Sequence, residues 1–204
     1  MSDQEFAALL SFATAMSFSP GPNTALSTAL AANFGLRRAL RFIAAVPCGW
    51  TLMMLLCGAG LGALIVAVPG LRVAVKVAGV AYLFWLAWTL ARSRRLVEAD
   101  AARLQVTFWQ GVGLQFLNIK AWMLALALAA GWVASAAGQP ATNPGERLAI
   151  VCGVMAVFAF TSNLAYALMG SLLRGWLVHG NRLAWFNRVM AAVLVATALW
   201  MLGA

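Results

Sequence analysis

The stretch Ser-Pro-Gly-Pro-Asn at residues 19–23 lies in the middle of the apolar segment Phe6–Phe34. Two prolines around a glycine cannot sustain the hydrogen-bond ladder of an α-helix, because proline lacks an N–H group and clashes with the preceding turn. We therefore predict a broken helix here rather than a simple kink. A helix broken at membrane depth exposes backbone polar groups that hydrocarbon cannot satisfy, so the break must face protein, water or a ligand.

The composition around this break is that of a membrane protein. Of the 204 residues, 64% are hydrophobic and 9% are charged, whereas soluble domains have about 25% charged residues. The mean hydropathy is +0.89. These values exclude a soluble globule, a disordered chain and a disulfide-rich secreted fold. At about 20 apolar residues per crossing, there is room for about six transmembrane helices, and we expect a single all-α membrane domain over residues 1–204.

Apolar runs alternate with clusters of charge and divide the chain into six predicted spans. The spans are Phe6–Phe34, Ala39–Val68, Leu71–Ala91, Val106–Ala137, Leu148–Leu173 and Trp185–Ala204. Ten of the 14 Lys and Arg residues lie around the gaps after the first, third and fifth spans. By the positive-inside rule, that face is cytoplasmic and both termini lie outside. This distribution explains the net charge of +9 without a nucleic-acid partner.

The two halves of the chain have a similar plan. The first span is interrupted at residues 20–23, and the fourth, which begins the second half, is interrupted by Asn-Ile-Lys at residues 118–120. An odd number of crossings per half inverts one half relative to the other, as in many secondary transporters. We therefore predict two inverted three-helix repeats. The sequence identity between the halves is too weak to prove a repeat, and coincidence is the alternative.

The break in the first span is a candidate binding site. A half-helix that begins after Pro22 presents free N–H groups and a positive dipole end, which favour an anion such as a carboxylate. Asn23 can cap this half-helix and also hydrogen-bond a solute. The alternative is a bent packing helix in which Asn23 satisfies its neighbours.

Lys120 is the only formal charge well inside a predicted span. A charge at this depth costs several kcal/mol and is usually functional or paired. No Asp or Glu lies in the apolar core of a span, so the partner must be a backbone carbonyl, a polar side chain, water or a substrate carboxylate. Asn118 nearby favours a polar cavity. The alternative is that Lys120 snorkels to the membrane interface.

The fifth span adds two polar residues, Asn163 and Tyr166, which share one helix face because they are three residues apart. They could line the same cavity, or they could hydrogen-bond neighbouring helices without any transport role. The predicted substrate-binding residues are Pro20, Gly21, Pro22, Asn23, Thr24, Asn118, Lys120, Asn163 and Tyr166.

The cysteines and acidic residues limit the alternatives. Cys48, Cys57 and Cys152 lie in apolar runs without CxxC spacing, so we expect no disulfide framework, metal site or cofactor. An intramembrane thiol-redox carrier would need Cys48 and Cys152 to meet, since Cys57 lies nine residues, about 13 Å, further along the same helix. A metal exporter lacks Asp, Glu or His ligands in the spans. A purely structural subunit offers no reason to bury Lys120.

Several motifs together resemble a known family. Pro-Gly-Pro-Asn at residues 20–23, followed by Phe-Gly-Leu-Arg-Arg at residues 34–38, resembles the signature of the lysine exporter and homoserine/threonine resistance (LysE/RhtB) family. Residues 76–83, 108–111, 118–121 and 186–188 are similar, in the same order, to parts of its third, fourth and sixth helices. The resemblance covers nearly the whole chain and implies a six-helix inner-membrane exporter of amino acids, driven by the proton motive force. The family's fourth-helix motif is usually Asn-Pro-Lys, whereas Ile119 stands in the middle here.

The residues and the resemblance together predict a secondary transporter, not an enzyme, that exports amino acids or closely related small metabolites. We expect a multi-pass protein of the bacterial inner membrane, surrounded by lipid, in which the first-helix break and Lys120 hold the substrate carboxylate. Protons are the expected coupling ion, although the spans contain no Asp, Glu or His. The alternatives are a thiol-redox carrier and an exporter of another small solute. The sequence does not decide which amino acid is moved, the stoichiometry, or whether the protein is a homodimer.

Overall fold

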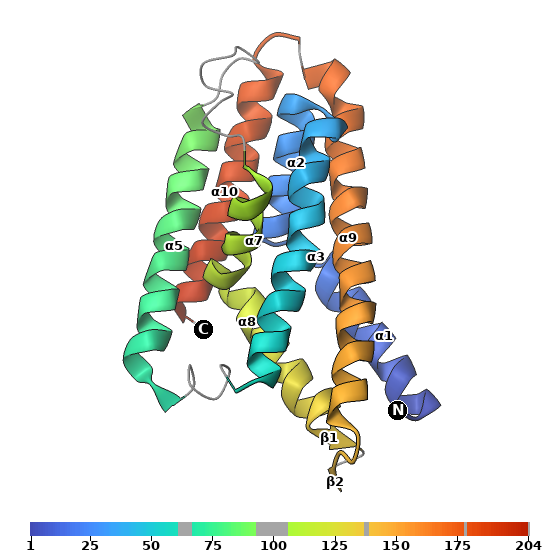
Figure 1. Cartoon of the computed structure of the whole chain (residues 1–204). Helices are drawn as coiled ribbons and strands as arrows, with labels where there is room; N and C mark the ends of the chain where they lie inside the picture. Colours follow the sequence, from blue (N-terminus) through green and yellow to red (C-terminus); the bar gives the residue numbers. More distant parts are fainter. Residues whose placement is uncertain (61–66, 93–105, 137–138, 178, 204) are drawn as a thin grey trace.

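The computed structural model describes residues 1–60, 67–92, 106–136, 139–177 and 179–203. Figure 1 shows a bundle of helices that run between two opposite ends of the molecule. The helices are α1 (Asp3–Phe18), α2 (Pro22–Phe34), α3 (Leu36–Gly58), α5 (Pro69–Arg92), α7 (Phe108–Leu117), α8 (Ile119–Leu128) with the π-helical turn η1 (Ala129–Val133), α9 (Pro144–Leu177) and α10 (Arg182–Gly203). The described residues are thus helical, as expected, apart from an antiparallel hairpin of β1 (Ser135–Ala136) and β2 (Gln139–Pro140).

The first predicted span is broken where the prolines occur. α1 ends at Phe18 and α2 begins at Pro22. Between them the backbone of Gly21 is extended, and the hydroxyl of Thr24 accepts its N–H at 2.9 Å and donates to its carbonyl at 3.0 Å. These bonds satisfy backbone groups that the break removes from the helical ladder. The predicted break at residues 19–23 is confirmed.

The fourth predicted span is broken as well. α7 and α8 meet at an angle of 70°. The residue at the junction, Asn118, has φ −92° and ψ 100°, outside the helical region. A proline is therefore not needed for the break, because one extended residue is enough to end one helix and begin the next.

Length and hydropathy identify the membrane spans among the described residues. Four helices are long and apolar enough to cross a membrane alone: Leu36–Gly58, Pro69–Arg92, Pro144–Leu177 and Arg182–Leu202. The bent pair of α7 and α8 with η1 forms a fifth candidate. The two pieces of the first span, α1 and α2, have 16 and 13 residues, each shorter than the roughly 20 needed to cross. The structure shows a helical, multi-pass membrane protein.

The predicted span boundaries agree with the helices to within a few residues. The predicted spans at 71–91 and 185–204 correspond to α5 and α10, whereas α9 extends the span predicted at 148–173 by four residues at each end. The last part of the second predicted span, residues 61–66, lies outside the described residues. The longer α9 includes Arg147 and Arg174 within the helix.

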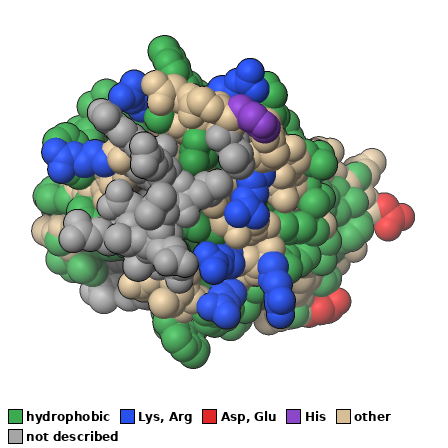
Figure 2. Space-filling view, turned by 90° about the horizontal axis from the view of Figure 1, so that it is seen from above, with side chains coloured by type: hydrophobic (Ala, Val, Ile, Leu, Met, Phe, Trp, Pro, Cys, Tyr) green, Lys and Arg blue, Asp and Glu red, His purple; other side chains and the backbone are tan. Residues whose placement is uncertain are grey.

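The direction of each helix places both chain ends on one side. Figure 1 shows α1, α2, α5 and α9 running upward, and α3, α7, α8 and α10 running downward, with both termini at the lower end. Seen from above, Lys and Arg side chains gather on the upper face (Figure 2). Two arginines near this end stack on tryptophans: Arg92 lies 3.9 Å from the ring centre of Trp88, and Arg182 lies 4.6 Å from that of Trp176. Such amphipathic pairs suit a membrane interface.

Close approaches at glycines set the positions of the broken helices. A Cβ atom at Gly170 of α9 would lie 2.3 Å from the Thr28 carbonyl oxygen of α2, and one at Gly79 of α5 would lie 2.0 Å from the Leu117 carbonyl oxygen of α7. Small residues let helix backbones approach this closely in membranes. α2 and the end of α7 are therefore held deep inside the bundle, next to the two breaks.

An ion pair ties the ends of three helical segments together at the lower end. Arg147, at the start of α9, is 2% exposed and donates to a Glu5 carboxylate oxygen at 2.7 Å and to the Trp132 carbonyl at 2.6 Å. The hydrogen bond from Arg147, together with that from the Ser2 backbone N–H, lowers the pKa of Glu5 to about 2. The start of α1 is thus fixed against α9 and η1.

Candidate functional site

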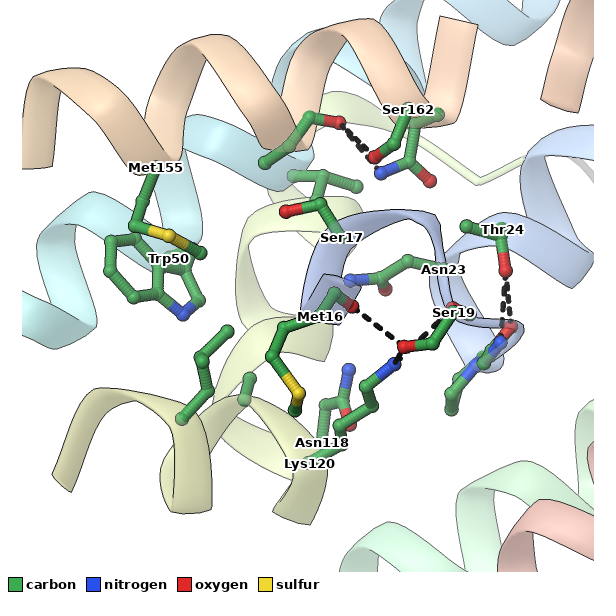
Figure 3. Close-up of a pocket in the computed structure, with 17 residues that line it drawn as sticks. Met16, Ser17, Ser19, Asn23, Thr24, Trp50, Asn118, Lys120, Met155 and Ser162 are labelled. Carbon is green, nitrogen blue, oxygen red and sulfur yellow. Dashed lines mark hydrogen bonds between the residues drawn. The ribbon is translucent and has the colours of Figure 1, made fainter. Parts of the chain in front are cut away.

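A cavity of about 70 Å³ lies between the two helix breaks (Figure 3). One water molecule needs about 10–15 Å³ of such space, so the cavity can hold several waters or a small solute. Its lining residues come from both breaks and from α3 and α9: Met16, Ser17, Ser19, Gly21, Pro22, Asn23, Thr24, Val46, Trp50, Asn118, Lys120, Ala121, Leu124, Met155, Ala159, Ser162 and Asn163. Seven of the nine predicted site residues are in this set.

Lys120 donates hydrogen bonds to the end of α1. Its Nζ donates to the Ser19 Oγ at 2.6 Å and to the Ser19 carbonyl at 3.3 Å. Ser19 is the C-cap of α1, where unpaired carbonyls carry partial negative charge. An ammonium has three donors, and these two bonds use two of them. The third has no partner among the described residues.

The formal charge on the described cavity wall is positive, although α1 and α7 also end there, at Ser19 and Asn118. The half-helices α2 and α8 both begin beside it, and their N-cap residues, Gly21 and Asn118, line it. Helix N-termini carry partial positive charge and free N–H groups. Lys120 is the one titratable residue among the described residues that line the cavity. This combination suits an anionic group such as a carboxylate.

The side chain of Asn23 does not cap α2, so that prediction is wrong. Thr24 takes the capping role through the bonds to Gly21 described above. Asn23 instead donates to Gln115 Oε1 at 2.8 Å, and Gln115 Nε2 donates to Asn23 Oδ1 at 3.3 Å. This reciprocal amide pair joins α2 to α7, across the two broken helices.

Gln115 was missed by the sequence analysis. It is completely buried and also donates to the Gly111 carbonyl at 3.1 Å. An amide in the apolar run 111–117 is a signal of a polar partner, because an unpaired amide is costly in an apolar environment. Ser19, the hydrogen-bond partner of Lys120, was also not among the predicted site residues, although it belongs to the predicted break at residues 19–23.

Two polar atoms of the cavity wall have no partner. Among the described residues, Trp50 Nε1 and Asn118 Oδ1 are the buried side-chain N and O atoms without a hydrogen bond. Trp50 is 4% exposed and Asn118 is 7% exposed. Most buried polar groups in proteins are hydrogen-bonded. Both residues that carry these atoms line the same cavity, and a polar solute there would be a candidate partner.

The remaining predicted residues differ in position. Asn163 lines the cavity, but its Oδ1 accepts from Ser27 at 2.9 Å and its Nδ2 donates to Ala159 at 2.8 Å. Tyr166 does not line it; its hydroxyl donates to the Phe18 carbonyl at 2.9 Å, at the end of α1. Of the predicted pair on one helix face, the structure therefore brings one residue to the cavity.

A second cavity adjoins the first. It has a volume of about 460 Å³ and lies between the end of α1, the start of α8 and the second half of α10. Its lining residues are Met16, Ser19, Pro20, Lys120, Val193, Ala196, Thr197 and Trp200. Ser19 and Lys120 line both cavities, so their hydrogen bond lies at the boundary between them. Pro20 belongs to this second cavity.

The cysteines take no part in either cavity wall. Cys48 is exposed, while Cys57 and Cys152 are buried in the same apolar cluster of α3, α8 and α9. Among the described residues, no group of three or more His, Cys, Asp or Glu side chains is placed to hold a metal ion.

Membrane-crossing helices, two of them broken around a polar cavity that contains a lysine, are typical of membrane transporters. The chain belongs to the LysE type translocator family, which it matches over residues 14–203. The family exports amino acids, so the protein is a transporter and not an enzyme.

Curated relatives are similar to the chain over most of their length. The chain is 31% identical over 193 residues to a cysteine/O-acetylserine efflux protein of Klebsiella pneumoniae subsp. pneumoniae, with 94% of each chain covered. It is 31% identical to the protein of that name in Salmonella typhimurium and 30% identical to that in Escherichia coli K12, each with 88% of both chains covered. No solved structure gives a significant match.

Proposed function

We propose that the protein exports a small, uncharged amino acid from the cytoplasm, with cysteine and O-acetylserine, the substrates in its relatives' names, as the first candidates. The observation that carries the proposal is the cavity at the helix breaks. It combines an ammonium, two helix N-termini and the unpartnered Asn118 Oδ1, and its described lining holds no carboxylate.

The two charged groups of an amino acid fit this wall. The carboxylate accepts from the third donor of Lys120 and from the free N–H groups at the start of α2 or α8. The ammonium donates to Asn118 Oδ1, which then ceases to be a buried acceptor without a partner. A zwitterion of this kind moves no net charge, and so avoids the roughly 2.3 kcal/mol per charge per 100 mV that an exported cation would meet.

The boundary between the two cavities suggests how the substrate leaves. A carboxylate that accepts from the third donor of Lys120 draws the ammonium toward the small cavity and away from Ser19. Weakening the Lys120–Ser19 bond separates α8 from the end of α1 and joins the small cavity to the larger one. The halves 1–92 and 106–203 then act as inverted repeats that rock against each other.

The position of the basic side chains also supports one orientation of the protein in the membrane. We place the protein in the inner membrane with the basic upper face in the cytoplasm, as the positive-inside rule requires. α1 and α2 together then form the first of six spans, and both termini lie outside. The larger cavity, beside the second half of α10, is on the outer side of Lys120 and serves as the exit. Protons remain the proposed coupling ion, and a homodimer the proposed assembly.

The test is substrate counterflow in proteoliposomes with a panel of radiolabelled amino acids. Lys120→Met should lower exchange about 10- to 100-fold, because a hydrogen bond to a charged group contributes about 1.5–3 kcal/mol. Lys76→Met makes the same change on α5 outside both cavities and should leave exchange near the wild-type level. Failure of the folded wild-type protein to exchange any amino acid would overturn the proposal.

A further inference from the structure

Trp50 in α3 has a hydrogen-bond donor without a partner. Its side chain is 4% exposed, and the Nε1 atom is buried without an acceptor. A buried N–H that loses its water without gaining a protein acceptor is costly. This cost is offset if a bound solute supplies the acceptor.

Other tryptophans in the same apolar cluster have their N–H groups satisfied. Trp122 Nε1 donates to the Phe116 carbonyl at 2.8 Å, and Trp132 Nε1 donates to the Glu5 carbonyl at 3.2 Å. The bundle can therefore provide acceptors for buried indoles. Trp50 differs from these two because its side chain lines the cavity and its Nε1 atom has no acceptor.

The position of Trp50 relative to the polar end of the cavity is informative. Figure 3 shows the indole, with its nitrogen toward the cavity, across from Lys120 and Asn118. The wall between them is largely apolar, with Met16, Ala121, Leu124 and Met155 among its residues. An amino acid whose charged groups bind at Lys120 and Asn118 would extend its side chain over these residues toward Trp50.

We propose that Trp50 is a specificity-determining residue, whose indole N–H donates a hydrogen bond to an uncharged acceptor oxygen on the substrate side chain. The proposal rests on the function proposed above and adds a substrate class: amino acids with an ester, carbonyl or hydroxyl oxygen in a short side chain. Of the two first candidates it therefore favours O-acetylserine over cysteine, whose thiol sulfur is only a weak acceptor. An apolar side chain of the same shape leaves the N–H unpaired. A side-chain carboxylate meets no second cation among the described lining residues, so it is disfavoured.

The experiment compares two substrates of similar shape in the counterflow assay. O-acetylserine and norleucine have side chains of equal length, but norleucine has methylenes in place of the ester oxygen and carbonyl. Wild type should prefer O-acetylserine by about tenfold, the value of one hydrogen bond in a buried site. Trp50→Phe keeps an aromatic ring and removes the donor, so the preference should fall toward one while norleucine exchange persists.

A second pair, serine and 2-aminobutyrate, makes the same comparison for a hydroxyl and a methyl group. If neither O-acetylserine nor norleucine is exchanged, this second pair tests whether the Trp50 N–H binds the side-chain oxygen. Absence of a preference in wild type, a ratio unchanged by Trp50→Phe, or an equal loss of both substrates would overturn the inference. The first two results mean that water satisfies the indole, and the third means that Trp50 binds the backbone groups of the substrate.

Trp122→Phe is the matched control. It makes the same substitution in the same apolar cluster, but removes a donor that has a partner. This variant should leave the substrate ratio unchanged and should lower the thermal stability of the purified protein more than Trp50→Phe does, because it removes a hydrogen bond in addition to buried volume. Trp50→Phe should change the ratio. A different result, in which the wild-type protein exchanges no amino acid at all, would overturn the proposed function itself.

Discussion

The Asn23–Gln115 pair links the two broken helices, and its contribution to stability can be measured by a double-mutant cycle. The two amides exchange hydrogen bonds of 2.8 Å and 3.3 Å. Interhelical hydrogen bonds in membrane proteins contribute about 0.6 kcal/mol each on average. Two such bonds give a coupling of about 1.2 kcal/mol, which is roughly an eightfold change in the unfolding equilibrium constant.

The variants are Asn23→Ala, Gln115→Leu and the double variant, unfolded reversibly in mixed micelles. Leucine is used at residue 115 because the site is completely buried and must stay filled. Each single substitution should destabilise the protein, and the double variant should be about 1.2 kcal/mol more stable than the sum of the two losses predicts. Strictly additive losses would show that the pair contributes no coupling, and would refute the idea that it joins α2 to α7.

Two further predictions concern packing and pH. Gly170→Ala should strongly destabilise the fold, because its Cβ would lie 2.3 Å from a backbone oxygen of α2. Gly175→Ala on the same helix meets nothing within 4 Å and should be tolerated. Equal thermal stability of the two variants in detergent would contradict this prediction. Because the pKa of Glu5 is lowered to about 2 from its usual 4.5, Glu5→Gln should be less stable than wild type at pH 7. That difference should shrink as the pH falls from about 4.5 toward 2, and a pH-independent difference would contradict the role of the Arg147 ion pair.

Lys120 is hydrogen-bonded to Ser19 and not to a carboxylate among the described lining residues. Ser19 stabilises the charge without neutralising it, because a hydroxyl and a carbonyl supply only partial negative charge. A buried carboxylate partner would instead compete with the substrate at full charge. If the substrate carboxylate binds at Lys120 as proposed, it meets no such competitor among the described lining residues.

Much of the architecture follows from local sequence. Length, hydropathy and the charges between apolar runs predict a multi-pass helical protein, because each crossing must satisfy its own backbone hydrogen bonds in hydrocarbon. The prolines at residues 20 and 22 predict the first break for the same local reason. The break at Asn118 is less apparent, since Ile119 is compatible with a helix and the extended conformation of Asn118 comes from its surroundings.

The partners of the polar side chains were decided by the tertiary structure. The sequence places Asn23, Lys120 and Gln115 in apolar runs, where each must find a partner, but it does not say which one. Gln115 meets Asn23 from 92 positions away, and Lys120 meets Ser19 from 101 positions away. These meetings depend on how closely α2 and α7 approach their neighbours at Gly170 and Gly79, which is a property of the packed bundle. Local sequence therefore determined where the helices break. Packing between distant helices determined which side chains share the cavity and which two buried polar atoms of the described residues have no hydrogen-bond partner.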